Sequence, residues 1–128
     1  MLREDIDELI ADILAKDARY ERDAYRFVLE CIASVREEDP LPKRRDFKAW
    51  ELLDLFRDRA LRLYGPMAMD VLGAWGVRSC RDFGRIIFNL VGAGLLGKSK
   101  DDKLEDFDQG YDFREAFRAP FLPRSKRP

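Results

Sequence analysis

The sequence predicts a mainly α-helical fold, and three observations support this prediction. Apolar residues recur at the three- and four-residue spacing of amphipathic helices in successive segments. Glycine and proline residues, which favour turns, separate these segments. The chain has 128 residues, 46% of them hydrophobic, and can bury one continuous core. We therefore expect one compact domain of five to six helices over residues 1–123 and a disordered basic tail over residues 124–128.

Two amphipathic patterns predict the first two helices. Residues 3–16 carry one apolar stripe, which consists of Ile6, Leu9, Ile10, Ile13 and Leu14. A second stripe over residues 21–37 includes Cys31, which we interpret as a small buried hydrophobe rather than a reactive thiol. Residues 37–47 hold two prolines and a cluster of charges, so we expect an exposed loop there.

Capping and turn residues predict the next two helices. Asp46 can cap a third helix, which we expect to end at Gly65, because glycine readily adopts the conformation that closes a helix. Pro66 suits the first turn of a short fourth helix that reaches Trp75. Gly76 then supplies a tight turn before the fifth helix.

The fifth helix is the most informative part of the chain. Ser79 and Asp82 form the S-x-x-D capping pattern at its start. Phe83, Ile87 and Leu90 then share its apolar stripe and are expected to anchor the core. Two helices joined by a short glycine turn are typical of a helix-turn-helix, so we expect a winged-helix-like C-terminal half.

The segment Leu96–Phe113 leaves two alternatives open. In a winged-helix arrangement it forms one small β-hairpin, with Tyr111 and Phe113 on the same face of a strand. In a purely helical bundle it is a long irregular loop. After it, Phe113, Phe117 and Phe121 recur every four residues and predict a last helical turn that packs on the domain.

The stretch GAGLLGKS, Gly92–Ser99, matches the phosphate-loop pattern G-x-x-x-x-G-K-[ST]. A functional phosphate loop lies between a buried strand and a helix. Here helical periodicity precedes the motif, and the following residues Asp101–Glu115 contain seven acidic and two basic side chains. We therefore predict that no nucleotide binds at Gly92–Ser99, and that Gly92 and Gly94 end the fifth helix.

Composition argues against catalysis and cofactor binding. The absence of histidine removes the usual proton shuttle and the commonest transition-metal ligand. The two cysteines are far apart in the sequence, and the acidic residues near the C-terminus lack the spacing of a calcium loop. We expect no enzyme activity, no cofactor and no metal. An acidic N-terminus and the absence of a long apolar run predict a cytoplasmic protein that does not contact a membrane.

The expected function is protein interaction, in an adaptor or regulatory role. Arg78, Arg81, Arg85 and Phe88 are the candidate partner-binding residues, because the fifth helix would present them outward. The alternative is a winged-helix-like regulator that binds nucleic acid through the same arginines. A competing interpretation of Phe88 is that the protein's own tail covers it. The identity of the partner and the oligomeric state do not follow from the sequence.

Several blocks also carry a family resemblance. They are YGPMAMDVLGAWGV, CRDFGRIIFNLVGAGLLGK, EDFDQGYDF and EAFRAPFLP. Together with KDARYERDAYRFV they resemble a family of short proteins largely confined to planctomycetes and verrucomicrobia. No activity, substrate or catalytic residue is assigned to that family, so the resemblance implies no function.

Overall fold

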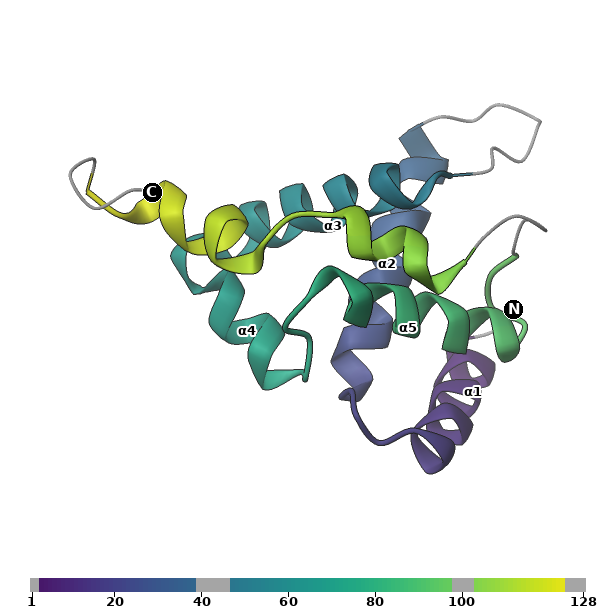
Figure 1. Cartoon of the computed structure of the whole chain (residues 1–128). Helices are drawn as coiled ribbons and strands as arrows, with labels where there is room; N and C mark the ends of the chain where they lie inside the picture. Colours follow the sequence, from purple (N-terminus) through teal and green to yellow (C-terminus); the bar gives the residue numbers. More distant parts are fainter. Residues whose placement is uncertain (1–2, 39–46, 98–102, 124–128) are drawn as a thin grey trace.

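The computed structural model describes residues 3–38, 47–97 and 103–123. Five α-helices and several shorter helical turns make up these residues, which confirms the prediction of a mainly helical fold (Figure 1). The elements in chain order are α1 (Arg3–Lys16), α2 (Arg22–Glu38), α3 (Ala49–Tyr64), η1 (Gly65–Met67), α4 (Ala68–Ala74), α5 (Cys80–Gly92), η2 (Leu104–Gln109), η3 (Arg114–Arg118) and η4 (Ala119–Phe121). Most of the loop predicted over residues 37–47 and the tail over residues 124–128 lie outside the described residues, although α2 continues to Glu38, one residue further than predicted.

Helix α5 contacts several of the other elements. It packs against α1, α2 and α3, and η2 lies against both α3 and α5 (Figure 1). The predicted anchors Phe83, Ile87 and Leu90 are 0%, 7% and 0% exposed, which confirms the predicted core face of this helix. Its burial is possible because the apolar stripe recurs at helical spacing along its whole length.

An aromatic cluster extends the core from α3 to the C-terminal segment. The Phe83 ring lies 4.8 Å from Phe56 and 5.8 Å from Phe113, measured between ring centroids. Phe117 packs edge-on against Phe113 at 5.0 Å. Phe113 and Phe117 are therefore buried as predicted, whereas Phe121 is 46% exposed, so the prediction that all three phenylalanines pack inward is wrong for Phe121.

Both cysteines are buried and free. Burial raises the pKa of Cys31 to about 12 and that of Cys80 to about 11. The Cys80 thiol donates a hydrogen bond to the carbonyl oxygen of Tyr111 at 3.2 Å. These thiols stay protonated near neutral pH and serve packing, as predicted for Cys31.

The predicted small β-hairpin over Leu96–Phe113 is not confirmed, since no strand occurs among the described residues of this segment. Leu104–Gln109 forms the 3₁₀ helix η2 instead. The Tyr111 hydroxyl donates to the carbonyl oxygen of Leu53 at 2.7 Å, and the Tyr111 ring stacks on Phe113 at 6.0 Å. Contacts with α3 and α5, rather than hydrogen bonds between strands, hold this segment in place. The winged-helix likeness is therefore not confirmed.

The predicted turn between α4 and α5 is present. The Gly76 N–H donates to the Gly73 carbonyl oxygen at 3.0 Å, and the Val77 N–H donates to that of Leu72 at 2.8 Å. This is a Schellman motif, and Gly76 supplies the required left-handed conformation with φ +90°. Ser79 and Asp82 then cap α5 reciprocally, as predicted: Ser79 Oγ accepts from the Asp82 N–H, and Asp82 Oδ2 accepts from the Ser79 N–H.

The start of α3 differs from the prediction. The helix begins at Ala49, and Asp46, the expected cap, lies outside the described residues. The residue at the cap position is Lys48, whose backbone N–H donates to Glu51 Oε1 at 3.2 Å. A carboxylate in the first turn thus satisfies one of the N–H groups at this helix end.

Candidate functional site

The glycines of the phosphate-loop motif close α5. The Leu95 N–H donates to the Leu90 carbonyl oxygen at 2.9 Å, and the Gly94 N–H donates to that of Val91 at 3.0 Å. Gly94 has φ +81°, whereas Gly92 keeps a negative φ as the last residue of the helix. The helix therefore ends at Gly92, as predicted, and Gly94 supplies the left-handed conformation of the turn that closes it.

The orientation of this helix end also opposes phosphate binding. A phosphate loop offers backbone N–H groups at a helix N-terminus, but the residues up to Gly92 form a helix C-terminus, which carries partial negative charge. Lys98 and Ser99 lie outside the described residues. The absence of nucleotide binding stays a prediction, which these observations favour.

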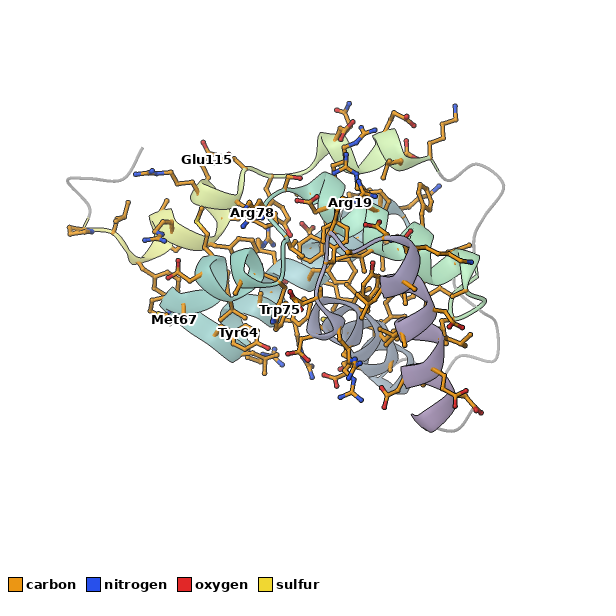
Figure 2. All side chains as sticks on the ribbon, turned by 90° about the horizontal axis from the view of Figure 1, so that it is seen from below. Arg19, Tyr64, Met67, Trp75, Arg78 and Glu115 are labelled. Carbon is orange, nitrogen blue, oxygen red and sulfur yellow. The ribbon has the colours of Figure 1, made fainter. Side chains whose placement is uncertain are left out.

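The four predicted partner-binding residues lie along one side of α5 and its N-terminal turn. Arg81, Arg85 and Phe88 are spaced four and three residues apart and share one stripe of the helix, which continues to Gly92. Arg78 precedes the helix and its side chain is exposed (Figure 2). Its backbone N–H donates to Asp82 Oδ2 at 2.9 Å.

Arg81 and Arg85, the two candidate arginines on α5, form ion pairs within the protein. The Arg81 guanidinium donates to Asp108 Oδ2 of η2 at 2.5 Å. The Arg85 guanidinium donates to Asp82 Oδ1 at 3.1 Å. Asp82 Oδ1 also accepts a hydrogen bond from the Tyr20 hydroxyl at 2.5 Å. Both guanidinium groups thus contribute to the fold.

Phe88 is partly buried, and the protein's own chain covers one side of its ring. The cover is Phe107 of η2, which meets the Phe88 ring edge-on with centroids 6.4 Å apart. This contact agrees with the competing interpretation that the protein's own chain covers Phe88, with Phe107 as one covering residue.

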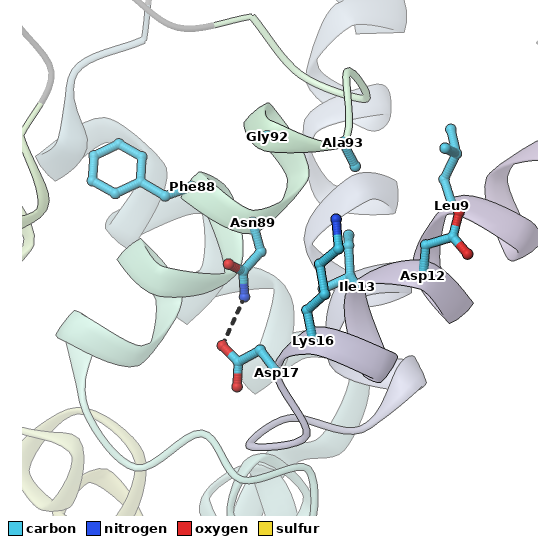
Figure 3. Close-up of a pocket in the computed structure, with 9 residues that line it drawn as sticks. All are labelled: Leu9, Asp12, Ile13, Lys16, Asp17, Phe88, Asn89, Gly92 and Ala93. Atoms are coloured by element: carbon cyan, nitrogen blue, oxygen red, sulfur yellow. Dashed lines mark hydrogen bonds between the residues drawn. The ribbon is translucent and has the colours of Figure 1, made fainter.

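The other side of the Phe88 stripe borders an open groove between α1 and α5, which we call the α1–α5 groove (Figure 3). Its volume is about 430 Å³, within the range of pockets that bind ligands. Its lining residues are Leu9, Asp12, Ile13, Lys16 and Asp17 from α1 and the residue after it, and Phe88, Asn89, Gly92 and Ala93 from the end of α5. More than half of these residues are apolar or lack a side chain.

Hydrogen bonds fix one end of this groove. Asn89 Nδ2 donates to Asp17 Oδ2 and to the Tyr25 hydroxyl oxygen, each at 3.0 Å (Figure 3). The Arg19 guanidinium donates to both carboxylate oxygens of Asp17, at 2.9 and 2.7 Å. The hydrogen bonds from Arg19 lower the pKa of Asp17 far below its usual range, even though burial opposes this shift. The groove is therefore bounded by a rigid junction between α1, α2 and α5.

No protein-family model, curated protein or solved structure matches this chain. The family resemblance therefore stays a prediction.

A second apolar surface lies elsewhere on the molecule. Figure 2 shows Met67, Tyr64 and Trp75 on one face, and Met67 and Leu63 are 57% and 51% exposed. The rings of Tyr64 and Trp75 pack on Phe27 at 6.4 and 5.7 Å, so they also serve the core. Exposed apolar residues of this kind are common on protein surfaces, and the α1–α5 groove is the stronger candidate site.

The pKa shifts resolved among the described residues share one direction relative to neutral pH. Every pKa shift resolved among the described residues moves away from neutrality: Asp17 and Asp82 shift down, and the shifted tyrosines, cysteines and arginines shift up. Burial raises the pKa of Tyr20 to about 12, for example. General acid–base catalysts need the opposite shift, toward the working pH.

Metal binding and membrane insertion also find no candidate in the described segments. Residues 3–38, 47–97 and 103–123 contain no group of three or more histidine, cysteine, aspartate or glutamate side chains that could hold a metal ion. Within the same segments, no helix combines the length and apolar character that a bilayer crossing requires.

Sequence reasoning missed the polar side of the groove. Asp17, Arg19 and Asn89 were not among the candidate residues, although the structure joins them. The available signal was Asn89 itself, a polar residue one position before the buried Leu90. Its partner Asp17 is 72 residues away in the sequence, so local patterns could not identify the pair.

Proposed function

We propose that this chain is a non-catalytic interaction domain that binds a segment of a partner protein in the α1–α5 groove. The observation that carries the proposal is the open groove of about 430 Å³, with apolar side chains on its walls and two helices beside it. Phe88, predicted as the anchor for a partner, stands at its edge.

Two features favour a peptide or helix as the occupant. The groove lies between helices, and an amphipathic helix can place residues of its apolar face into such a groove. Gly92 lines the wall, and a Cβ at this position would contact nothing within 4 Å, which leaves room for a partner backbone. The hydrogen bonds of Asp17 and Asn89 hold the walls before binding, so little order has to be gained on association.

Nucleic-acid binding has less support. Recognition through α5 would need its outer face free to enter a groove of the duplex. Phe107 and Asp108 of η2 lie against that face. Arg81 already forms an ion pair with Asp108, and Arg85 forms one with Asp82. Phosphate contacts would have to displace these carboxylates.

A substitution that fills the groove tests the proposal. A Cβ at Gly92 would meet nothing within 4 Å, and the φ of Gly92 is not positive, so we expect Gly92→Phe to retain the fold. The matched control is Ala11→Phe, which adds the same ring at an exposed position on the opposite side of α1 from Leu9. Circular dichroism and urea denaturation of both variants check that they fold like the wild type.

Selection from a displayed library of random helical peptides then provides the binding measurement. We expect peptides that bind the wild type and Ala11→Phe with micromolar affinity and bind Gly92→Phe at least tenfold more weakly, a difference of about 1.4 kcal/mol. Failure to select any peptide, or peptides that bind Gly92→Phe as well as the wild type, would contradict the proposal.

A further inference from the structure

We infer that the segment bound in the α1–α5 groove is a basic amphipathic helix, with apolar residues on one face and lysine or arginine beside that face. The inference rests on the proposed function, and it adds the chemistry of the partner. It follows from the charges on the α1 wall of the groove.

The α1 wall is acidic. Helix α1 has five acidic and two basic residues. Asp5, Leu9, Asp12 and Lys16 recur at helical spacing on one stripe, and Glu8 lies at its edge. Leu9, Asp12 and Lys16 line the groove itself. The Asp12 carboxylate therefore places negative charge on the groove wall one turn after Leu9.

Three of the acidic side chains of α1, those of Asp5, Glu8 and Asp12, do not help to hold the described part of the fold together. Two other carboxylates have structural roles. Asp17 forms an ion pair with Arg19, and Asp7 forms an ion pair with Arg26, each with an N–O distance of 2.7 Å. In contrast, Asp5, Glu8 and Asp12 are exposed and form no ion pair within the part of the chain that the structure describes. Asp12 in the groove wall and Asp5 on the same stripe of α1, with Glu8 nearby, complement a partner that has basic residues next to its apolar anchors.

Lys16 is the opposing charge on this wall. Figure 3 shows its side chain extending from α1 toward Ala93, at the carboxyl end of α5. A cation is favourable there because of the partial negative charge at a helix C-terminus, and the last turn of α5 has no basic residue of its own. Lys16 therefore complements α5, and the carboxylates of Asp5, Glu8 and Asp12 stay available to the partner.

Two synthetic helical peptides test the inference. They share one leucine face and differ in the flanking positions, which are lysine in one peptide and glutamate in the other. Fluorescence anisotropy at low and high salt gives their affinities for the wild type and for Gly92→Phe. We expect the lysine peptide to bind at least tenfold more tightly than the glutamate peptide, to weaken at high salt, and to lose binding in Gly92→Phe.

Charge substitutions locate the effect. Asp12→Asn combined with Asp5→Asn should weaken the lysine peptide roughly three- to tenfold, whereas Lys16→Gln should strengthen it or leave it unchanged. Glu115→Gln is the matched control, because Glu115 is exposed on η3, far from α1 (Figure 2). It should leave both affinities unchanged.

The outcomes separate this inference from the proposed function. Equal binding of both peptides, lost in Gly92→Phe, overturns the basic partner and retains the groove as a binding site. Preference for the glutamate peptide does the same. Binding of the lysine peptide that Gly92→Phe does not weaken overturns both, because the attraction would then be general to the acidic surface.

Discussion

Gly76 connects two parts of the fold that are far apart in the sequence. A Cβ at this position would collide with the carbonyl oxygen of Arg19, in the turn between α1 and α2. The adjacent Trp75 carbonyl oxygen accepts a hydrogen bond from the Glu21 N–H at 3.0 Å. Glycine is therefore required here twice, for its φ of +90° and for the close approach of a second backbone.

The substitution Gly76→Ala should destabilise the protein by about 2 kcal/mol or more, since it adds left-handed strain and a backbone collision. Gly92→Ala, in contrast, meets open space with a helical φ and should be neutral or stabilise by up to about 1 kcal/mol. Urea denaturation of the two variants gives both values. Equal effects would show that the turn at Gly76 can relax.

The stability of the junction between α1, α2 and α5 should depend on pH through the carboxyl group of Asp17. Hydrogen bonds from Arg19 lower its pKa in the folded state, so its stabilising contribution is complete above the unfolded value of about 3.9 and declines as pH falls below it. Asp17→Asn should therefore cost about 1–2 kcal/mol at pH 7, and the difference from wild type should shrink below pH 4. Denaturation midpoints of both proteins between pH 3 and pH 7 test this. A difference that is constant with pH would contradict the assignment.

At the scale of elements, η2 determines which face of α5 is free. Phe107 packs where α5 has no side chain: a Cβ at Gly84 would lie 2.7 Å from Phe107 Cδ2. The ring also meets Phe88, and Asp108 holds Arg81. This short 3₁₀ helix thus covers part of the side of α5 that was predicted to face a partner, and the proposed binding surface is the side of α5 that faces α1.

The contact between Gly84 and Phe107 can be measured with a double-mutant cycle. Alanine is favoured over glycine in a helix by about 1 kcal/mol, yet Gly84→Ala should destabilise the wild type by about 1–3 kcal/mol because the Phe107 ring is buried and cannot yield. In a Phe107→Ala background the same change should become neutral or stabilising. If Gly84→Ala is equally harmful in both backgrounds, η2 does not pack on Gly84 as described.

At the scale of the whole molecule, the C-terminal segment belongs to the core. Phe107, Phe113 and Phe117 are 4%, 4% and 0% exposed. Loss of one such ring costs roughly 3–5 kcal/mol, so the loss of all three is comparable to the 5–15 kcal/mol that stabilises a typical domain. We therefore expect the helices before Gly97 to need the C-terminal segment in order to stay folded.

Truncation after Gly97 should abolish the cooperative urea transition and expose apolar surface to a hydrophobic dye. Truncation after Pro123, which removes the residues expected from the sequence to form a disordered tail, is the control and should unfold like the full chain. A cooperative transition in the shorter protein at an unchanged urea concentration would contradict this account of the core.

The sequence alone determined the features that depend on neighbouring residues. The five α-helices, the Ser79–Asp82 cap, the turn at Gly76 and the core face with Phe83, Ile87 and Leu90 all arise from spacing and backbone preference within a few residues. The arrangement of Arg81, Arg85 and Phe88 on one stripe of α5 also follows from their spacing.

The tertiary structure alone decided which parts of that surface are free. Arg81 meets Asp108 across 27 residues and Asn89 meets Asp17 across 72, and α1 and α5 form the groove only when the chain is folded. The segment after Gly97 was also undecided, because its aromatic residues fit a strand as well as a loop. Contacts with Gly84 and Leu53 fix its shape, and such contacts between distant segments leave no periodic pattern in the sequence.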